Sequence, residues 1–393
     1  MHLNLKLAVI AAAVALAACG KKEEAAPAAG AAPAAAPTQV VKIGHVGPTS
    51  GAIAHLGKDN ENGARMAIDD LNAAGVTIGG ARITFELLPE DDAADPRQGV
   101  AAAQKLIDAK VAGVIGHLNS GTTIPASQLY HDAGIPQISP SSTNPKYTRQ
   151  GFPGAFRVVA DDTALGGTLG RYAVETLGGK SVAVIDDRTA YGQGVADEFE
   201  KAVVAAGGTV VGREFTNDKA TDFNAILTTI RARRPDVIFF GGMDAVAGPM
   251  LRQMKQLGIE AKFMGGDGIC TAQLSVLAAG SMADDQVYCA KAGGIDPEDV
   301  PGMEKFRADF RTKFGMDVQL YAPYVYDALN VMVQAMKDAN STDPAVYLPA
   351  LKAVNYKGVT GPIAFDEKGD IKNGALTLIT YRGGERHELA VIR

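Results

Sequence analysis

The chain has 393 residues, 47% hydrophobic and 21% charged, which is typical of a globular protein long enough for two lobes of about 150 residues each. Its net charge is −6 and no basic stripe stands out, which argues against a nucleic-acid partner. Tryptophan is absent and aromatic residues make up 6% of the chain, so few aromatic side chains are present to stack on nucleotides or sugars.

Residues 1–18 are expected to form a secretory signal peptide. Lys6 gives the segment a short basic start, and the apolar run that begins at Leu7 is too short to span a membrane in the mature protein. The end of this run, Leu16 to Cys19, resembles a bacterial lipobox, which implies cleavage before Cys19 and lipid attachment to its thiol. The alternative is a plain signal-peptidase site after one of the alanines.

Residues 19–39 are expected to tether the folded domain to a membrane. After a short charged segment, the sequence becomes an Ala/Pro tract that runs to Pro37. About twenty residues of semi-extended chain, at ~3.1 Å each, would allow a reach of up to ~60 Å. Export would also place Cys270 and Cys289 in an oxidising compartment, where a disulfide is expected; two buried free thiols are the alternative.

The chain from residue 40 to about residue 160 alternates apolar strands with amphipathic helices. This alternation predicts an α/β fold in which a parallel sheet is covered by helices on both faces. The expected strands are 40–48, 81–92, 111–117 and 135–139, and the expected helices are 59–74, 98–109 and 123–134.

The same alternation restarts after residues 156–162 and predicts a second lobe built like the first. The expected strands are 181–187, 209–215, 236–242, 261–268 and 286–294, and the expected helices are 163–178, 192–207, 222–233, 245–257 and 272–279. Three further helices, 300–314, 322–339 and 344–354, are expected to return to the first lobe. The last segment predicts antiparallel strands about turns at Lys368-Gly369 and Gly383-Gly384.

Two hydroxyl-rich loops follow successive strands of the first lobe, at residues 119–123 and 139–144. Ligands of open α/β sheets bind beyond the carboxyl ends of the strands, so these loops predict a polar binding site. The first loop also opens a helix, whose free N–H groups favour a carboxylate or another anion. Serine, threonine and asparagine are also ordinary helix caps and turn formers, but their clustering on adjacent strand ends favours a site.

Taken together, the motifs resemble the Leu/Ile/Val-binding family of periplasmic substrate-binding proteins, the receptors of branched-chain amino-acid ABC importers. The resemblance covers residues 40–393. It implies a type I periplasmic-binding-protein fold, in which each of two lobes is a mostly parallel sheet flanked by helices and three hinge strands join the lobes. The segments that carry it are HVGPTSGAIAHLG, NGARMAIDDLNAAG, DDAADPRQGVAAAQKL, VIGHLNSGTT, ISPSSTNP, DDRTAYGQGVADEF and FMGGDG.

The resemblance implies lobe boundaries and hinge positions. Lobe 1 would comprise residues 40–161 plus 294–366, and lobe 2 residues 162–293 plus 367–393. The hinge crossings are expected near Asp161, Gly293 and Asp366.

The resemblance also implies a ligand site in the cleft between the lobes. The amino acid's carboxylate would be held by Ser120 and Thr143, and its ammonium group by the second loop and by the carboxylate of Asp267. Tyr191 would close over the ligand from the second lobe. The full set of expected ligand-binding residues is Ser120, Ser141, Ser142, Thr143, Tyr191, Asp267, Leu56 and Met243.

The chemistry of these residues agrees with a zwitterionic ligand, which needs hydrogen-bond donors at one end and an anion at the other. Asp267 stands between glycines that allow close backbone approach, although an Asp-Gly pair is also a common turn. Leu56 and Met243 stand where the family carries aromatics, and Asp267 replaces its usual glutamate. One methylene of ligand is worth only ~0.8 kcal/mol, so such a site separates aliphatic side chains weakly.

An enzyme is the first rival interpretation. The segment 178–181, GGKS, fails as a phosphate loop because Val174 replaces the required glycine and the segment leads into a strand. The histidines show no paired zinc spacing, and no GxSxG motif appears. The acidic pairs 91–92 and 186–187 resemble paired catalytic carboxylates, but caps and hinge contacts are the favoured interpretation.

The expected partners are therefore a branched-chain amino acid and the permease subunits of an ABC importer, with no nucleic acid, metal or cofactor. The protein is expected to be a periplasmic monomer, anchored to a bacterial membrane through Cys19. Two alternatives stay open. One is a binding protein for another small amino acid, an amide or a carboxylate, and the other is a lipid-anchored sensor that reports ligand occupancy to a partner protein.

Overall fold

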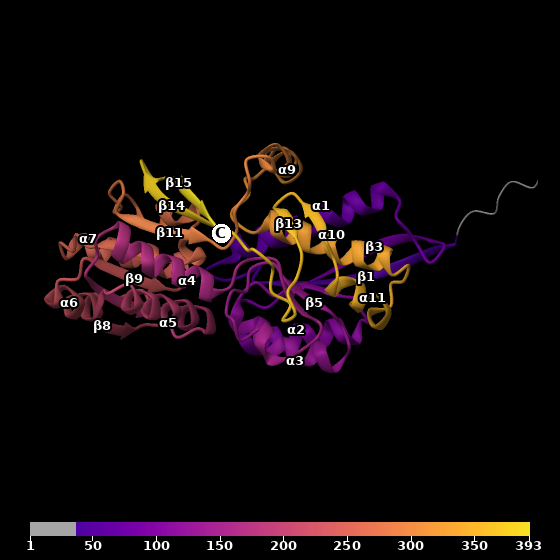
Figure 1. Cartoon of the computed structure of the whole chain (residues 1–393), viewed down its shortest axis with the longest axis horizontal. Helices are drawn as coiled ribbons and strands as arrows, with labels where there is room; N and C mark the ends of the chain where they lie inside the picture. The colour runs from indigo at the N-terminus through magenta and orange to yellow at the C-terminus, as the bar shows by residue number, and fades with distance from the viewer. Residues whose placement is uncertain (1–36) are drawn as a thin grey trace, which may run out of the picture. The chain divides into compact units, whose positions relative to one another are not determined.

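The computed structural model of the protein describes residues 37–393 (Figure 1). The expected signal peptide, the lipid-attachment residue Cys19 and most of the tether lie outside the described residues. No helix within residues 37–393 is both long enough and apolar enough to cross a membrane.

The first lobe is built on a six-stranded sheet with the order β2-β3-β1-β4-β5-β6. All neighbouring strands run parallel except β2, which pairs antiparallel with β3. The strands β4 and β5 are buried at every position, as a sheet covered on both faces requires. The strands are β1 (Thr38–Gly47), β2 (Thr77–Ile78), β3 (Ala81–Asp91), β4 (Val114–Gly116), β5 (Gln137–Ser139) and β6 (Ala155–Arg157).

The helices between these strands are α1 (Ala54–Ala74), α2 (Pro96–Asp108) and α3 (Ser120–Asp132). A short 3₁₀ turn, η1 (Thr148–Gln150), precedes β6. Helix α2 begins as its sequence predicts, because Asp95 accepts from the backbone N–H groups of Arg97 and Gln98, and Pro96 occupies the first turn.

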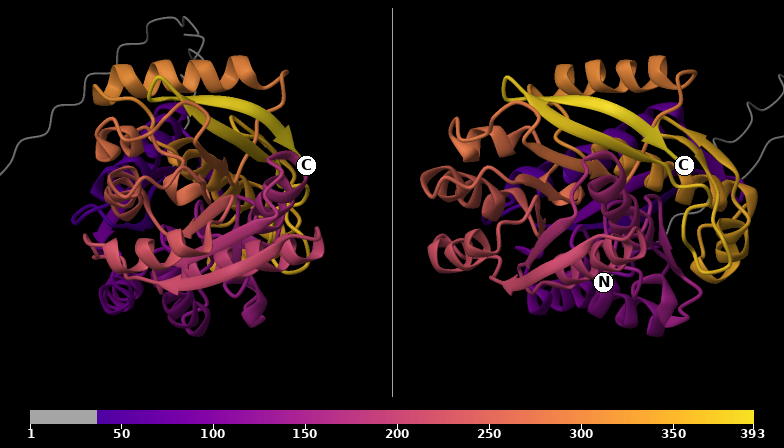
Figure 2. Two further views of the ribbon diagram at one scale, coloured as in Figure 1. Left: turned by 90° about the vertical axis from the view of Figure 1, so that its left-hand side faces the viewer. Right: turned by 60° about the vertical axis from the view of Figure 1, so that its left-hand side comes forward.

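The second lobe is built on a seven-stranded sheet with the order β15-β14-β11-β10-β9-β7-β8. The C-terminal hairpin of β14 and β15 adds two antiparallel strands to its edge (Figure 2). The remaining five strands are parallel, and the buried run VIFFG of β9 lies among them. The strands are β7 (Ser181–Asp186), β8 (Thr209–Phe215), β9 (Val237–Gly241), β10 (Lys262–Gly265), β11 (Val287–Lys291), β14 (Leu376–Arg382) and β15 (Glu385–Ile392).

The helices of this lobe lie in the connections between its strands. The first of them, α4, continues into a π-helical turn, η2, which periodicity did not predict. They are α4 (Asp162–Arg171), η2 (Tyr172–Thr176), α5 (Ala190–Ala205), α6 (Asn224–Arg233), α7 (Asp244–Gln256), η3 (Asp267–Ile269) and α8 (Gln273–Ala278).

The segment after β11 returns to the first lobe, as expected, and α10 packs along α1 (Figure 1). The two helix backbones approach closely at Gly63, where a Cβ atom would collide with the backbone of Ala322. The returning elements are α9 (Val300–Phe314), α10 (Ala322–Asp338), α11 (Pro344–Lys352) and the two-stranded ribbon of β12 (Tyr356–Gly358) and β13 (Gly361–Ile363). Periodicity did not predict this ribbon.

Helix α1 differs from its prediction in where it begins. The sequence predicted a helix from residue 59 after a loop punctuated by glycines, but the helix begins at Ala54 and contains Gly57. A side chain at position 57 would collide with the backbone of Pro48, so this glycine permits close packing inside the helix.

The lobe boundaries stay a prediction. Two of the expected crossings lie beside each other, because the N–H of Ala160 donates to the carbonyl of Ala292 at 3.3 Å. Asp366 instead opens a tight turn in which its carboxylate accepts from the N–H of Asp370 at 2.9 Å, and Gly374 is the residue that approaches Ala160. We therefore expect the third crossing nearer Gly374 than Asp366.

Cys270 and Cys289 form a disulfide that joins the segment after η3 to β11, with Cα atoms 5.6 Å apart. The structure thus supports pairing over two free thiols.

We expect the Cys270→Ala/Cys289→Ala double variant to lose about 3 kcal/mol of unfolding free energy, because the bond closes a loop of about twenty residues in the unfolded chain. Urea unfolding with and without a reductant measures this. The reductant should lower the unfolding midpoint of the wild type and should not affect that of the variant. Equal midpoints for the variant and the wild type without reductant would contradict the prediction.

Candidate functional site

The two hydroxyl-rich loops lie side by side beyond the neighbouring strands β4 and β5. Ser120, the first residue of α3, accepts hydrogen bonds from the Ser142 hydroxyl and from the backbone N–H of Asn144, each at 3.2 Å. The Ser141 hydroxyl donates to the carbonyl oxygen of Leu118 at 3.0 Å. These bonds cross between the loops, so each loop fixes the position of the other.

Arg157 fixes the second loop, residues 139–144, through hydrogen bonds to its backbone. Its side chain is fully buried, and it donates to the carbonyl oxygens of Ser142 at 2.8 Å and Asn144 at 3.1 Å. Asp370 pairs with the same guanidinium at 2.6 Å. A buried charge is tolerated only when it is paired and hydrogen-bonded, so this arrangement anchors the loop firmly.

One buried polar atom of these loops, Oδ1 of Asn119, has no hydrogen-bond partner among the described residues. Most buried polar atoms in proteins are hydrogen-bonded, so an exception calls for an explanation. Oγ1 of Thr143, in the second loop, lies beside the buried carboxyl of Asp162.

The carboxylate of Asp267 lies between two tyrosine hydroxyls. Tyr191, on the first turn of α5, donates to Oδ1 at 2.8 Å and accepts from the N–H of Gly268 at 2.9 Å. Tyr321, which directly precedes α10, donates to Oδ2 at 2.8 Å. Tyr191 and Asp267 belong to the second sheet and its helices, whereas Tyr321 comes from the segment packed on the first, so this carboxylate joins the two lobes.

Asp59 on α1 positions Tyr321. Its buried carboxylate accepts hydrogen bonds from four consecutive backbone N–H groups, at 2.8 to 3.1 Å, which fixes the turn in front of α10. Burial raises the pKa of Asp59, while these hydrogen bonds oppose the shift. The four donors are Gln319, Leu320, Tyr321 and Ala322.

A cavity of about 10 Å³, room for about one water molecule, lies between the loops and the tyrosines, so the lobes must move apart to admit a larger ligand. Of the residues predicted from sequence, Ser120, Ser141, Tyr191 and Met243 line it. Ser142 bonds to Ser120 behind the lining, and Thr143 and Asp267 are buried nearby. Leu56 lies in the core of the first lobe and is not part of the lining. The complete lining is Leu118, Asn119, Ser120, Ser141, Tyr191, Met243 and Tyr321.

Sequence reasoning missed Tyr321, because the rule that places ligands at strand ends does not apply to a helix start far along the chain. It also missed Asp162 as a member of this region. The carboxylate of Asp162 is fully buried beside the Thr143 side chain, and the N–H of Asp162 donates to the carbonyl of Thr143 at 2.8 Å. Burial raises the pKa of Asp162 well above its usual value; a hydrogen bond with the Thr143 side chain opposes the shift, and the nearby Asp267 adds to it.

Further contacts join the two lobes around the cavity. Nε2 of His55 on α1 lies 2.9 Å from a carboxylate oxygen of Asp244, the first residue of α7. Asn144 donates its side-chain N–H to the carbonyl of Ala190 at 2.6 Å. Together with Tyr321 and Asp267, these contacts define a closed arrangement of the lobes.

The acidic pairs that resembled catalytic carboxylates serve local structure. Asp92 pairs with the buried His117 at 3.2 Å, and Asp186 pairs with Arg213 at 2.8 Å. Asp91 accepts from the N–H of Thr49, and Asp187 accepts from the side chain and the N–H of a neighbouring threonine. Within residues 37–393, no cluster of three or more histidine, cysteine or acidic side chains is arranged to hold a metal ion.

Residues 40–385 match the model of a protein family described as periplasmic binding protein. The chain belongs to this family. Among its relatives, an amino acid binding protein of Pseudomonas aeruginosa is 40% identical over 84% of this chain and 87% of its own length. The Leu/Ile/Val-binding protein homolog 1 of Brucella abortus is 38% identical over 86% of this chain and 89% of its own length.

Solved structures of such proteins have the same fold. The substrate-binding protein of a branched-chain amino acid transporter from Streptococcus pneumoniae, solved in complex with isoleucine, matches with a TM-score of 0.79 and 27% identity. The match covers 90% of this chain and 99% of that one. The fold is therefore the two-lobe type I fold expected from the sequence, and the family name implies a periplasmic location.

In this periplasmic binding protein, Tyr321 makes the hydrogen bond to Asp267 that crosses between the lobes, whereas Tyr191 makes one within the second lobe. A hydrogen bond to a charged group contributes about 1.5–3 kcal/mol, so Tyr321→Phe should shift the equilibrium between closed and open lobes about tenfold or more towards open.

Tyr191→Phe is the matched control, because it removes a bond to the same carboxylate and leaves the lobes bridged. Small-angle X-ray scattering of the ligand-free protein reports the opening. Equal scattering from Tyr321→Phe and the wild type would show that this bond does not hold the lobes together.

Asp267 also makes stability depend on pH. Burial raises its pKa from 3.8 to about 6, although hydrogen bonds from Tyr191 and Tyr321 oppose the shift. Because the folded-state pKa lies above the unfolded one, the stability contributed by the protonated carboxyl is fully present below the unfolded pKa and is lost as pH rises through the folded pKa.

We therefore expect Asp267→Asn to remove up to about 3 kcal/mol of the fall in unfolding free energy between about pH 4 and pH 7. Urea unfolding at both pH values measures the difference. Asp222→Asn is the control, because hydrogen bonds from Asn224 lower the pKa of that exposed carboxyl and it does not titrate in this range. An identical fall in wild type and Asp267→Asn would refute the assignment.

Proposed function

We propose that this periplasmic binding protein captures a branched-chain L-amino acid in the cavity between its lobes and delivers it to the permease of an ABC importer. The observation that carries the proposal is the arrangement around the cavity, with hydroxyl loops at the start of a helix on one side and the buried Asp267 on the other. The relatives named as amino acid and Leu/Ile/Val-binding proteins support the same ligand class.

The ligand's carboxylate is assigned to the start of α3. Ser120 lies there, and the helix has no side-chain cap, so its first N–H groups and the positive end of its dipole are directed toward an anion. The Thr143 hydroxyl, which lies beside the Asp162 carboxyl, is the second expected donor.

The ammonium group is assigned to Asp267. With a pKa of about 6 this carboxylate is ionised at neutral pH, and each oxygen that accepts a tyrosine hydroxyl keeps a further lone pair. The loop around Ser141 is the second expected contact. Opposite charges at the two ends of the site would orient an α-amino acid in one direction.

The side chain of the ligand is assigned to the apolar part of the lining, formed by Leu118 and Met243. Both are flexible aliphatic side chains, and neither offers a polar group to a ligand side chain. An apolar pocket separates ligands that differ by one methylene by about 1–3 kcal/mol, so overlapping affinities for leucine, isoleucine and valine are expected. Leu56 is expected to influence the size of the pocket from behind.

Closure of the lobes is the proposed transport signal. A ligand shifts this equilibrium only as far as it binds the closed form better than the open form. The bonds from Tyr321 to Asp267 and from His55 to Asp244 form only when the lobes meet, and a bound zwitterion would contact both lobes at once. The permease would then recognise the closed form of a monomer that Cys19 and its lipid hold near the membrane.

Calorimetric titration of the refolded protein, free of carried ligand, with leucine, isoleucine, valine, phenylalanine and small amides tests the proposal. We expect micromolar or tighter binding of an aliphatic amino acid, and loss of binding in Asp267→Ala. Thr143→Val should weaken binding about tenfold, because it removes an expected donor to the ligand's carboxylate.

The matched control is Thr123→Val. This hydroxyl donates to the carbonyls of Asn119 and His117, so its removal should lower stability and leave the ligand contacts in place. If no α-amino acid binds, the proposal fails, and short carboxylates and amides become the next ligands to test.

A further inference from the structure

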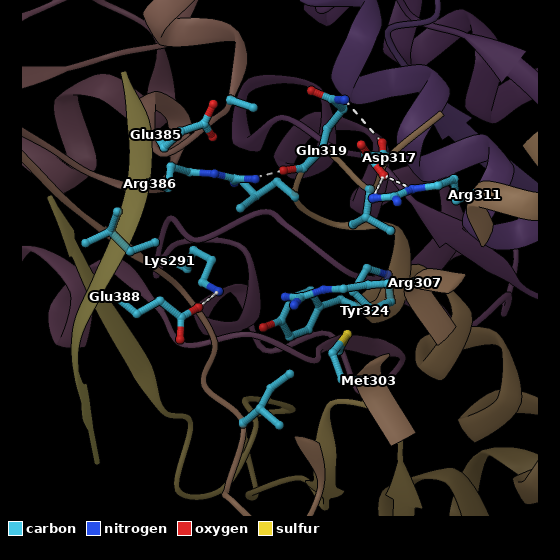
Figure 3. A pocket seen from close by; sticks show the side chains of 16 residues that line it. Lys291, Met303, Arg307, Arg311, Asp317, Gln319, Tyr324, Glu385, Arg386 and Glu388 are labelled. Atoms are coloured by element: carbon cyan, nitrogen blue, oxygen red, sulfur yellow. Dashed lines mark hydrogen bonds and ion pairs between the residues drawn. The ribbon is translucent and has the colours of Figure 1, made fainter. Parts of the chain in front are cut away.

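A second cavity, of about 380 Å³, lies apart from the amino-acid site, between α9 and the β14–β15 hairpin (Figure 3). It shares no lining residue with the cavity around Ser120 and Tyr191. Its walls come from α9 and the turn before α10 on one side, and from β11, β14 and β15 on the other.

Four basic side chains line this cavity, and two of them have acidic partners. Lys291 pairs with Glu388 at 2.9 Å, and Arg311 pairs with Asp317. Arg307 and Arg386 have no carboxylate within 4.0 Å among residues 37–393. Two guanidinium groups thus border one cavity without a direct ion pair among the described residues, although the carboxylates of Asp317, Glu385 and Glu388 also line it.

The two unpaired arginines come from opposite walls. Arg386 on β15 reaches across the cavity, where it donates to the carbonyl oxygens of Gln319 at 3.1 Å and Cys270 at 3.0 Å. Figure 3 shows Arg307 and Tyr324 projecting from the other wall toward Lys291. Donors from several elements therefore converge on one space.

The titration of the neighbouring groups indicates a positive potential there. Burial lowers the pKa of Lys291, and Arg307 and Arg386 lower it further, against the effect of Glu388. Burial would raise the pKa of Glu388, but Lys291, Arg307 and Arg386 outweigh it, and the pKa is lowered.

We propose that this cavity binds a small oxyanion, a carboxylate or a phosphate, held between Arg307 and Arg386. Guanidinium groups match both anions with paired N–H donors, and an anion here would give both arginines an ion pair that they lack among the described residues. Tyr324 and Lys291 line the same cavity. This site goes beyond the amino-acid site and does not depend on it.

The anion would also favour closure of the lobes. Helix α9 packs on the first lobe, where Met303 and Phe306 contact Met66, whereas Lys291 and Arg386 belong to the second sheet. An anion that contacts both walls binds the closed form better than the open one. Since such coupling is reciprocal, the anion raises the affinity of the amino-acid site, and the amino acid raises that of the anion.

The test is calorimetric titration of the purified protein with inorganic phosphate and, separately, with succinate, at constant ionic strength. Arg307→Gln is the informative variant, because the Arg307 side chain makes no hydrogen bond or ion pair among the described residues and lies on an exposed helix face. Lys305→Gln is the matched control: it removes the same charge from the same helix, and Lys305 pairs with Asp309 instead of lining the cavity.

We expect saturable binding of at least one anion to the wild type and to Lys305→Gln, weakened about tenfold or more in Arg307→Gln. The tighter of the two anions identifies the ligand chemistry. Absence of saturable binding, or equal weakening by both variants, would overturn the proposal. These anion titrations contain no amino acid, so their outcome does not depend on whether the proposed function is correct.

A second titration tests the coupling. The saturating anion should raise the affinity of the wild type for leucine about fivefold or more, the lower end of typical allosteric coupling, and should not do so in Arg307→Gln. An unchanged leucine affinity in the wild type would overturn the link to lobe closure.

Discussion

The closed arrangement of this protein depends on one buried carboxylate that both lobes satisfy. Asp267 accepts a hydrogen bond from Tyr191 of its own lobe and another from Tyr321 of the opposite lobe. A carboxylate buried without such donors would be costly, so the lobes must either meet around it or open it to water or a ligand. The same group that holds the lobes together is therefore the one best placed to recognise a cationic ligand.

This constraint explains why distant parts of the chain are arranged so firmly. Asp59 fixes the turn that presents Tyr321, and Arg157 fixes the loop that contains Thr143. Each is a buried charge that is hydrogen-bonded to several backbone groups, so the loops of the binding surface are preorganised on each lobe. Closure then only needs to bring two rigid surfaces together. The cavity beside Arg307 lies across the same junction, so the proposed anion would be coupled to the same motion.

Much of this fold could be predicted because its signals are local. Buried parallel strands are continuous apolar runs, and the hydroxyl loops at their ends marked Ser120 and Ser141, which line the cavity. Tyr321 and the cavity at Arg307 could not be predicted, because they depend on how a helix returns to pack on an element some 250 residues earlier. The sequence did not predict the early start of α1, because a glycine such as Gly57 usually indicates a loop. Here Gly57 lies inside the helix and allows it to pack closely against the backbone of Pro48.

A crystal structure of the protein with leucine tests the central claim most directly. The account predicts leucine between the lobes, with its carboxylate at Ser120 and the start of α3, its ammonium group beside Asp267 and its side chain against Met243. Leucine bound in the reverse orientation, or bound outside this cavity, would contradict the account. Because the proposal assigns to Asp267 the charge that orients the ligand, the position of the ammonium group is the decisive observation.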